Sequence, residues 1–324
     1  MQFPLYHRPS AVAFLDDDAA YLDMLADVMP GDWCVRLYTR TGDCIQNLQQ
    51  EHAVWESDVN AHLQITAAWR EGTPLVPQLL QYWCSQPQRY ALTNVLVVDY
   101  SMPAMTGLEV FSALSKWPAQ RVLLTGQADE SLAVKVFNQR LINQFVPKQL
   151  PHIGQHLTQV VGALNASPLL VHDSIWRNAL KTEQCAALQA AGVPQALAVL
   201  VRERGWVEYC VLAEPFGILG INAQAVPQWL QLERTQDLPD AAELAESAGQ
   251  SRQAAQQIRE GKHLSNAELA MALSCDTPIA LAPAFAIGPL QALLGAFFDL
   301  PESCLAGPGH SEFLRSLAPR GVTP

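Results

Sequence analysis

The stretch Asn94-Val-Leu-Val-Val-Asp-Tyr-Ser-Met-Pro103 decides the fold of this chain. Residues 95–98 form a short apolar run that ends at a single aspartate, Asp99, and such a run is typical of a strand buried on both faces of a sheet. Similar runs occur at 11–15, 34–38, 121–124 and 143–146, and helical patterns lie between them. Strands that alternate with helices predict a doubly wound α/β fold with a parallel sheet of five strands.

Polar side chains follow these predicted strands at the same end. A run of three aspartates, 16–18, follows the first strand, Asp99 ends the third, Thr125 ends the fourth and Lys148 ends the fifth. Because the carboxyl ends of parallel strands line one crevice, we expect the four segments to converge on one pocket. Crowded carboxylates repel one another unless a hard cation joins them, and Mg²⁺ prefers carboxylate and phosphate oxygens. A lone carboxylate beside that cation can accept a phosphoryl group while an ammonium neutralises the developing charge.

This pattern resembles the CheY-like receiver domain of two-component response regulators, whose fold is flavodoxin-like. The resemblance covers residues 11 to about 164, interrupted near 41–90, and it includes Met102-Pro103 and Gly107 in the loop after the acceptor. It implies that the residues named above are a phosphorylation site. By this resemblance Asp99 is the phosphoacceptor, and Asp16 and Asp17 are the acids that bind the metal. Ser101 would add a metal-binding main-chain carbonyl. Thr125 would be the switch hydroxyl, and Lys148 the lysine that pairs with the phosphate.

Three features of the site depart from that family or stay open. Asp18 is a register alternative for the metal acids, although the cap of a helix that begins at Ala19 is its favoured role. The usual Lys-Pro is Lys148-Gln149 here, so the loop that carries the ammonium can lie differently. The aromatic switch position is Phe145, which lacks a hydroxyl. We therefore expect the phosphorylation chemistry to be intact and its readout to be unusual.

The segment from about 41 to 90 is longer than a compact α/β unit needs. Apolar residues at near-helical spacing predict two helices, one on each side of Gly72 and Pro74, with an antiparallel pair as one arrangement. Trp55, Trp69 and Trp83 are its large side chains. They either pack onto the host domain or form a dimer or partner surface. We predict a helical projection on the flank of the sheet that contributes to self-association.

The first domain is predicted to span 9–165 and to be followed by a C-terminal output domain at 168–324. Apolar runs at 198–201, 207–212, 217–221 and 228–232 predict a strand meander, and polar helices are expected at 241–260 and 265–273. These elements indicate a small α+β domain with a mostly antiparallel sheet. The stretches 208–221 and 229–232 have a similarity to PAS-like sensory modules. The rich apolar tail that follows either completes this domain's core or covers a partner surface.

Composition excludes several output classes. The net charge is −11 and both halves of the chain carry excess acid, which opposes binding to a phosphate backbone. No Lys or Arg occurs between Lys262 and Arg315, so a helix-turn-helix there would lack phosphate contacts. His172-Asp173 is not repeated downstream as a metal phosphohydrolase would require. Nucleic acid is therefore not an expected partner.

The sequence also predicts a cytoplasmic protein. Its N-terminus lacks the pattern of a secretory signal, and the seven cysteines form no CxxC pair, which fits reduced thiols. The uncharged segment Thr277–Phe298 is nearly long enough to cross a bilayer, but it contains three prolines and has no basic anchor. A buried or partner-covered hairpin is favoured over a membrane element.

The sequence thus predicts a response regulator that takes a phosphoryl group onto Asp99 with Mg²⁺ from a sensor histidine kinase or phosphotransfer protein. It would signal through an unidentified protein target or through homodimerisation. The resemblance implies only receiver self-phosphorylation and autodephosphorylation, and no motif identifies an output enzyme. Two alternatives remain: a receiver that controls a hydrolase-type C-terminal domain, and a pseudo-receiver that acts as a scaffold without taking phosphate.

Overall fold

The computed structural model describes residues 2–126, 141–273, 277–301, 304, 307–320 and 322–323, and the chain divides into two compact units. We call the first the parallel-sheet unit; it comprises residues 9–58, 88–167 and 313–324. The second, the antiparallel-sheet unit, comprises residues 1–8, 59–87 and 168–312. Both contain an N-terminal and a C-terminal part of the chain, whereas the sequence suggested one boundary near 165–168.

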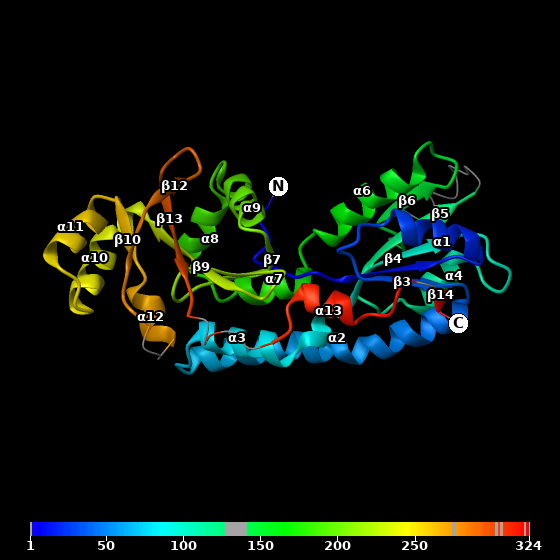
Figure 1. Ribbon diagram of the computed structural model, residues 1–324, viewed down its shortest axis with the longest axis horizontal. Coiled ribbons are helices and arrows are strands. Elements are labelled where there is room, and N and C mark those ends of the chain that lie inside the picture. Colours follow the sequence, from blue (N-terminus) through cyan, green and yellow to red (C-terminus); the bar gives the residue numbers. More distant parts are fainter. Residues whose placement is uncertain are drawn as a thin grey trace. The chain divides into compact units, whose positions relative to one another are not determined.

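The parallel-sheet unit is built on a sheet with the strand order β14-β3-β2-β4-β5-β6 (Figure 1). All neighbouring strands in it are parallel. This confirms the predicted flavodoxin-like sheet of five strands, to which β14 adds a short edge strand. The bounds are β2 (Ala11–Leu15), β3 (Val35–Tyr38), β4 (Thr93–Asp99), β5 (Gln120–Thr125), β6 (Gln144–Pro147) and β14 (Val322–Thr323).

Helices cover both faces of this sheet, because successive side chains of a strand point to opposite sides. Val12 and Phe14 of β2 pack with α1 (Ala19–Val28) and α6 (Ile153–Asn165). The intervening Ala13 and Leu15 pack with the start of α2 (Thr41–Arg70) and with α4 (Gly107–Ala113). The central strands β2 and β4 are consequently buried along their full length, as their apolar runs predicted.

The long segment after β3 forms the two predicted helices, α2 and α3 (Leu75–Ser85), followed by the 3₁₀ helix η1 (Pro87–Ala91). Cys44 and Leu48 of α2 belong to the core of the parallel sheet. The apolar face of α3, including Leu79 and Trp83, belongs to the core of the antiparallel-sheet unit. Because α2 is continuous, it contributes residues to both units.

The antiparallel-sheet unit confirms the predicted α+β class. Its sheet has the order β1-β7-β8-β9-β13-β12 with antiparallel neighbours throughout, and β10 pairs with β11 in a separate antiparallel sheet of two strands. A Cβ on Gly220 would lie 2.1 Å from the Trp206 ring, so glycine lets this indole lie flat on β8. The bounds are β1 (Tyr6–His7), β7 (Trp206–Leu212), β8 (Gly217–Asn222), β9 (Pro227–Arg234), β10 (His263–Ser265), β11 (Leu281–Pro283), β12 (Phe285–Ile287) and β13 (Leu293–Asp299).

Short helices complete this unit and correct two of the expected elements. They are α7 (Leu170–Arg177), α8 (Thr182–Gln189), α9 (Val193–Glu203), η2 (Thr235–Asp237), α10 (Leu238–Ser247), α11 (Arg252–Arg259) and α12 (Ala267–Leu273), and α13 (His310–Ser316) follows at the boundary with the other unit. Residues 198–201, expected as a strand, continue α9, where Val193 and Leu197 form a buried helical face. The expected helix 241–260 is two helices, because Gly249 adopts a φ of 92° and Ser251 caps a new start.

The uncharged segment Thr277–Phe298 contains the expected hairpin, formed by β12 and β13. Leu293, Ala296 and Phe298 of β13 are buried in the core of the unit, so this part of the apolar tail completes the core. Among the described residues no single helix is long and apolar enough to span a membrane, and α8 with α9 meets those criteria only as a pair bent by 80°. Free thiols are found at Cys34, Cys44, Cys84, Cys185 and Cys210, and Cys275 lies outside the described residues.

Candidate functional site

Asp99 ends β4 at the carboxyl edge of the parallel sheet, and its side chain is buried. One carboxylate oxygen, Oδ1, lies 2.7 Å from the Lys148 ammonium. The other, Oδ2, accepts a hydrogen bond of 2.9 Å from the Ser101 backbone N–H. The two contacts fix the carboxylate plane. Ser101 therefore lies at the site through its N–H, and the role of its carbonyl stays a prediction.

The acidic run after β2 separates into different environments. Asp16 is buried, and its Oδ2 lies 2.6 Å from the Lys148 ammonium. Asp17 is exposed, yet carboxylate oxygens of Asp16, Asp17 and Asp99 all lie within 4.8 Å of one another. Asp18 instead caps α1, because its Oδ1 accepts from the N–H groups of residues 20 and 21. The structure thus gathers Asp16 and Asp17 with Asp99 and engages Asp18 in capping.

Lys148 reaches this cluster although the family's Lys-Pro is absent. Pro147 pairs with Thr125 in the parallel ladder, and the Lys148 N–H donates to the Thr125 carbonyl over 2.8 Å. This backbone bond sets the start of the loop, so the ammonium bridges Asp16 and Asp99. Thr125 itself is buried at the end of β5. The substitution by Gln149 consequently does not move the ammonium away from the acids.

The electrostatics of the cluster follow from burial and from this bridge. Burial raises the pKa of Asp16, and the hydrogen bond with Lys148 offsets part of that effect. For Lys148, burial acts to lower the pKa, but hydrogen bonds to Asp16 and Asp99 outweigh it and the pKa is raised. The ammonium therefore stays charged, and it neutralises part of the charge on the two buried carboxylates.

Tyr21 is a neighbour of the site that the sequence did not single out. The Lys148 ammonium lies 4.7 Å from the centre of the Tyr21 ring, which is within the range of a cation–π contact. Burial raises the pKa of the Tyr21 hydroxyl to about 12. Its position in the first turn of α1, where Asp18 also accepts the Tyr21 N–H, is the one signal that could have pointed to it.

Gly107 packs closely against the backbone of Asp99. A Cβ at this position would lie 2.6 Å from the Asp99 carbonyl oxygen and 2.9 Å from the Leu123 side chain. The preceding Thr106 forms a capping box with Glu109, which fixes where α4 begins. The loop after Asp99 can therefore pack this closely only with glycine at 107.

The donor set suits a hard divalent cation. Three carboxylates from two strand ends supply oxygens close enough to share one ion, and one of them, Asp16, is buried with a raised pKa. Oxygen ligands of this kind match Mg²⁺, which binds one or two carboxylates together with phosphate. Asp16, Asp17 and Asp99 are thus the residues that would hold it.

Two other motifs have structural roles. His172 is buried and stacks on Tyr6, with ring centres 5.1 Å apart. Asp173 accepts the Leu5 N–H over 2.7 Å and pairs with Arg177. Phe145, at the aromatic switch position on β6, is partly buried against the core that contains Leu123.

No protein-family model matches the sequence, and no curated protein matches it either. Among solved structures, the chain is similar to the Legionella pneumophila response regulator LqsR, with 22% identity, a TM-score of 0.73 and 98% of each chain covered. A receiver domain from Methanospirillum hungatei JF-1 matches 48% of this chain and 94% of its own length, with 15% identity and a TM-score of 0.31. The receiver domain of a putative Luxo repressor protein from Vibrio parahaemolyticus matches 52% and 97%, with 15% identity and a TM-score of 0.35.

The match to LqsR extends over both units, whereas the two receiver matches cover about half of the chain. The antiparallel-sheet unit is not identified by any of these similarities. The chain therefore shares the fold of the response regulator LqsR over both units, and its parallel sheet has the flavodoxin-like strand order.

Proposed function

We propose that this protein is a response regulator that accepts a phosphoryl group on Asp99 in the presence of Mg²⁺. The observation that carries the proposal is the Lys148 ammonium, which bridges Asp16 and Asp99 at 2.6 and 2.7 Å beside a third carboxylate, Asp17. A site of this composition offers a nucleophile, a cation-binding pair and a fixed positive charge. These are the elements that phosphoryl transfer requires.

The reaction moves one phosphoryl group between two side chains. An Asp99 oxygen attacks the phosphorus of a phosphohistidine on the donor, an O–P bond forms, and the N–P bond breaks. The donor imidazole leaves and takes a proton from solvent. Mg²⁺, when bound, would supply positive charge for the phosphoryl oxygens. Lys148 would pair with the same oxygens, and Asp16, Asp17 and Asp99 would hold the cation.

The phosphoryl group would then be read by neighbouring side chains. Lys148 contacts both carboxylates, so a new anion on Asp99 competes with Asp16 for the ammonium. Thr125, at the end of the adjacent strand, is the hydroxyl that would bond the new oxygens. Phe145 would be the aromatic side chain that changes position in response, and its ring lacks the hydroxyl of a tyrosine. Each of these steps changes the charge or the contacts around Asp99 and thereby shifts the conformation of a neighbouring loop.

The proposal includes a sensor histidine kinase or phosphotransfer protein as donor, a cytoplasmic location and a homodimeric active state. The antiparallel-sheet unit would serve as the output module toward a protein partner. A pseudo-receiver that never takes phosphate is the alternative that the experiments below separate from this proposal.

The first test is phosphorylation by a small-molecule donor. Wild-type protein, Asp99→Asn and the control Asp27→Asn, which changes an exposed acid near the end of α1, are incubated with acetyl phosphate and Mg²⁺. Intact-mass spectrometry should find one added phosphoryl group on the wild type and on the control, and none on Asp99→Asn. Absence of the group on all three proteins, or its presence on Asp99→Asn, would refute the assignment.

The second test addresses self-association. Light scattering is recorded with Mg²⁺ in the presence and absence of beryllofluoride, which mimics the phosphoryl group. A mass increase confined to the wild type and the control supports a homodimeric active state. An unchanged mass, with phosphorylation intact, would remove dimerisation from the proposal and leave phosphoacceptance standing.

A further inference from the structure

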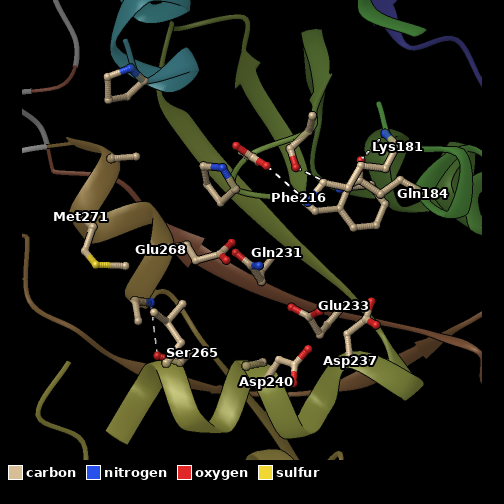
Figure 2. Close-up of a pocket in the computed structure, with 18 of the residues that line it drawn as sticks. Lys181, Gln184, Phe216, Gln231, Glu233, Asp237, Asp240, Ser265, Glu268 and Met271 are labelled. Atoms are coloured by element: carbon tan, nitrogen blue, oxygen red, sulfur yellow. Dashed lines mark hydrogen bonds and ion pairs between the residues drawn. The ribbon is translucent and has the colours of Figure 1, made fainter. Parts of the chain in front are cut away.

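The antiparallel-sheet unit contains a cavity of about 710 Å³ that the proposed phosphorylation does not use (Figure 2). Its walls come from the turn between α2 and α3, the end of β9, α10, α12 and the start of α8. A volume of this size is within the range of small-molecule sites. All of the lining residues belong to this one unit.

The charged groups of the lining are mostly negative. Six of the lining residues are acids, whereas Lys181 and Arg234 are the cations among them. Both cations are engaged: Arg234 makes a two-pronged contact with Asp237, and Lys181 lies 3.3 Å from Glu214. The acids are Glu183, Glu214, Glu233, Asp237, Asp240 and Glu268. The cavity therefore carries an excess of negative charge.

Two of these acids, Glu233 and Glu268, line the same part of the cavity; Glu233 is partly buried and Glu268 is exposed. Figure 2 shows both side chains extending into the same space from β9 and α12, with Asp237 and Asp240 on the neighbouring wall. The pKa of Glu233 is raised to about 8, first by burial and then by the charges of Glu268 and Asp237, against the opposing effects of Gln231 and Arg234. Burial likewise raises the pKa of Glu268, with Glu214 as the second cause. A bound positive charge would relieve this repulsion.

The arrangement of the acids favours an extended cation over a single metal ion. Among the described residues, no three ligand atoms of the cavity acids lie within 4.8 Å of one another, unlike those of Asp16, Asp17 and Asp99. The lining also contains apolar residues: Trp69, Phe216, Leu264 and Met271 contribute aromatic and aliphatic surface. A cavity that combines separated acidic groups with apolar surface suits amines joined by a methylene chain.

We propose that this cavity binds an elongated organic cation, a diamine or polyamine, with its amines at Glu233 and Glu268 and its methylene chain against Trp69 and Phe216. Such a ligand would make the antiparallel-sheet unit a sensor of a cationic metabolite. This inference adds an input beyond the proposed phosphorylation, and it does not require Asp99.

Isothermal titration calorimetry on the full chain tests the proposal. Putrescine and spermidine are titrated at 150 mM salt, where weak attraction to a protein of net charge −11 is screened. The variants are Glu233→Gln and Glu268→Gln, and the matched control is Glu243→Gln, an exposed acid on α10 outside the cavity lining. Thermal melting of each variant verifies that it is folded.

We expect one saturable site in the wild type, the control and Asp99→Asn, and at least tenfold weaker binding in both cavity variants. A 1,8-octanediol titration, which keeps the chain and removes the charge, should produce no binding. The proposal is overturned if neither amine binds, if the two cavity variants bind as well as the control, or if Mg²⁺ alone occupies the same site with higher affinity. Because Asp99→Asn is included, failure here leaves the phosphorylation proposal untouched.

Discussion

Glu233→Gln is expected to stabilise the protein at alkaline pH. Burial is the main cause that raises the pKa of Glu233 to about 8, and Glu268 and Asp237 add to it, while Gln231 and Arg234 act in the opposite direction. In the unfolded chain this carboxyl titrates near 4.5. Between these two values the folded state holds a proton that the unfolded state has lost, so the free energy of unfolding falls as the pH rises from about 4.5 to about 8.

The size of the effect follows from the shift. A change from 4.5 to about 8 corresponds to at most roughly 5 kcal/mol, at about 1.4 kcal/mol for each pKa unit. Glu233 is partly open to solvent in the cavity, so screening reduces the value and we expect about 2 kcal/mol. The neutral amide of the substituted side chain removes this penalty. The variant should therefore match the wild type near pH 5 and exceed it by about 2 kcal/mol at pH 8.5.

Urea denaturation at pH 5 and pH 8.5 measures the difference, with Glu243→Gln as a control whose carboxyl is exposed. Tryptophan fluorescence and circular dichroism are followed together, because a chain of two units can unfold in more than one step. If the stabilities of wild type and Glu233→Gln change in parallel between the two pH values, Glu233 does not hold a proton in the folded state and the reasoning fails.

Three further predictions concern the parallel-sheet unit. Gly107→Ala should destabilise it by about 1–3 kcal/mol because the new methyl meets the Asp99 carbonyl, whereas Gly42→Ala, with open space around it, should be neutral or stabilising in thermal melts; equal melting temperatures would contradict this. Asp17→Asn should lose Mg²⁺ affinity in a calorimetric titration, whereas Asp18→Asn, which can still cap α1, should keep it; the reverse order would assign the metal acids differently. Arg320→Ala should lower the free energy of unfolding by about 1–2 kcal/mol in urea titrations, since the Arg320 guanidinium donates to the carbonyls of Ala26, Met29, Pro30 and Trp33. An unchanged midpoint of urea unfolding would show that water replaces these bonds.

Much of the acidic site at the carboxyl edge of the parallel sheet could be predicted, because it depends on where the strands end. In a parallel sheet, every strand delivers its last residue to the same edge, whatever the length of the connections. Asp16, Asp99 and Lys148 therefore meet as the sequence suggested, even across the long segment that forms α2 and α3. The Lys148-Gln149 departure changed nothing there, because the backbone bond to Thr125 sets the register.

Other assignments needed the structure because the sequence offered equivalent choices. Three adjacent aspartates have the same chemistry, and only the backbone direction at the start of α1 makes Asp18 a cap. Residues 198–201 are apolar enough for a strand, but Val193 and Leu197 on the same buried face place them in α9. A run of four residues is too short to distinguish the two-residue period of a strand from the 3.6-residue period of a helix.

The sequence by itself thus determined the parallel sheet, the polar residues at the ends of its strands and the antiparallel sheet of the other unit. These features follow from local hydrophobic patterns. The tertiary structure alone decided which segments make each unit. Edge strands as short as β1 and β14 form only where a neighbouring strand already offers its free backbone groups. It also decided the acidic cavity, since Trp69, Glu233 and Glu268 lie far apart in the chain and share no motif. Their proximity is a product of packing, which local patterns do not encode.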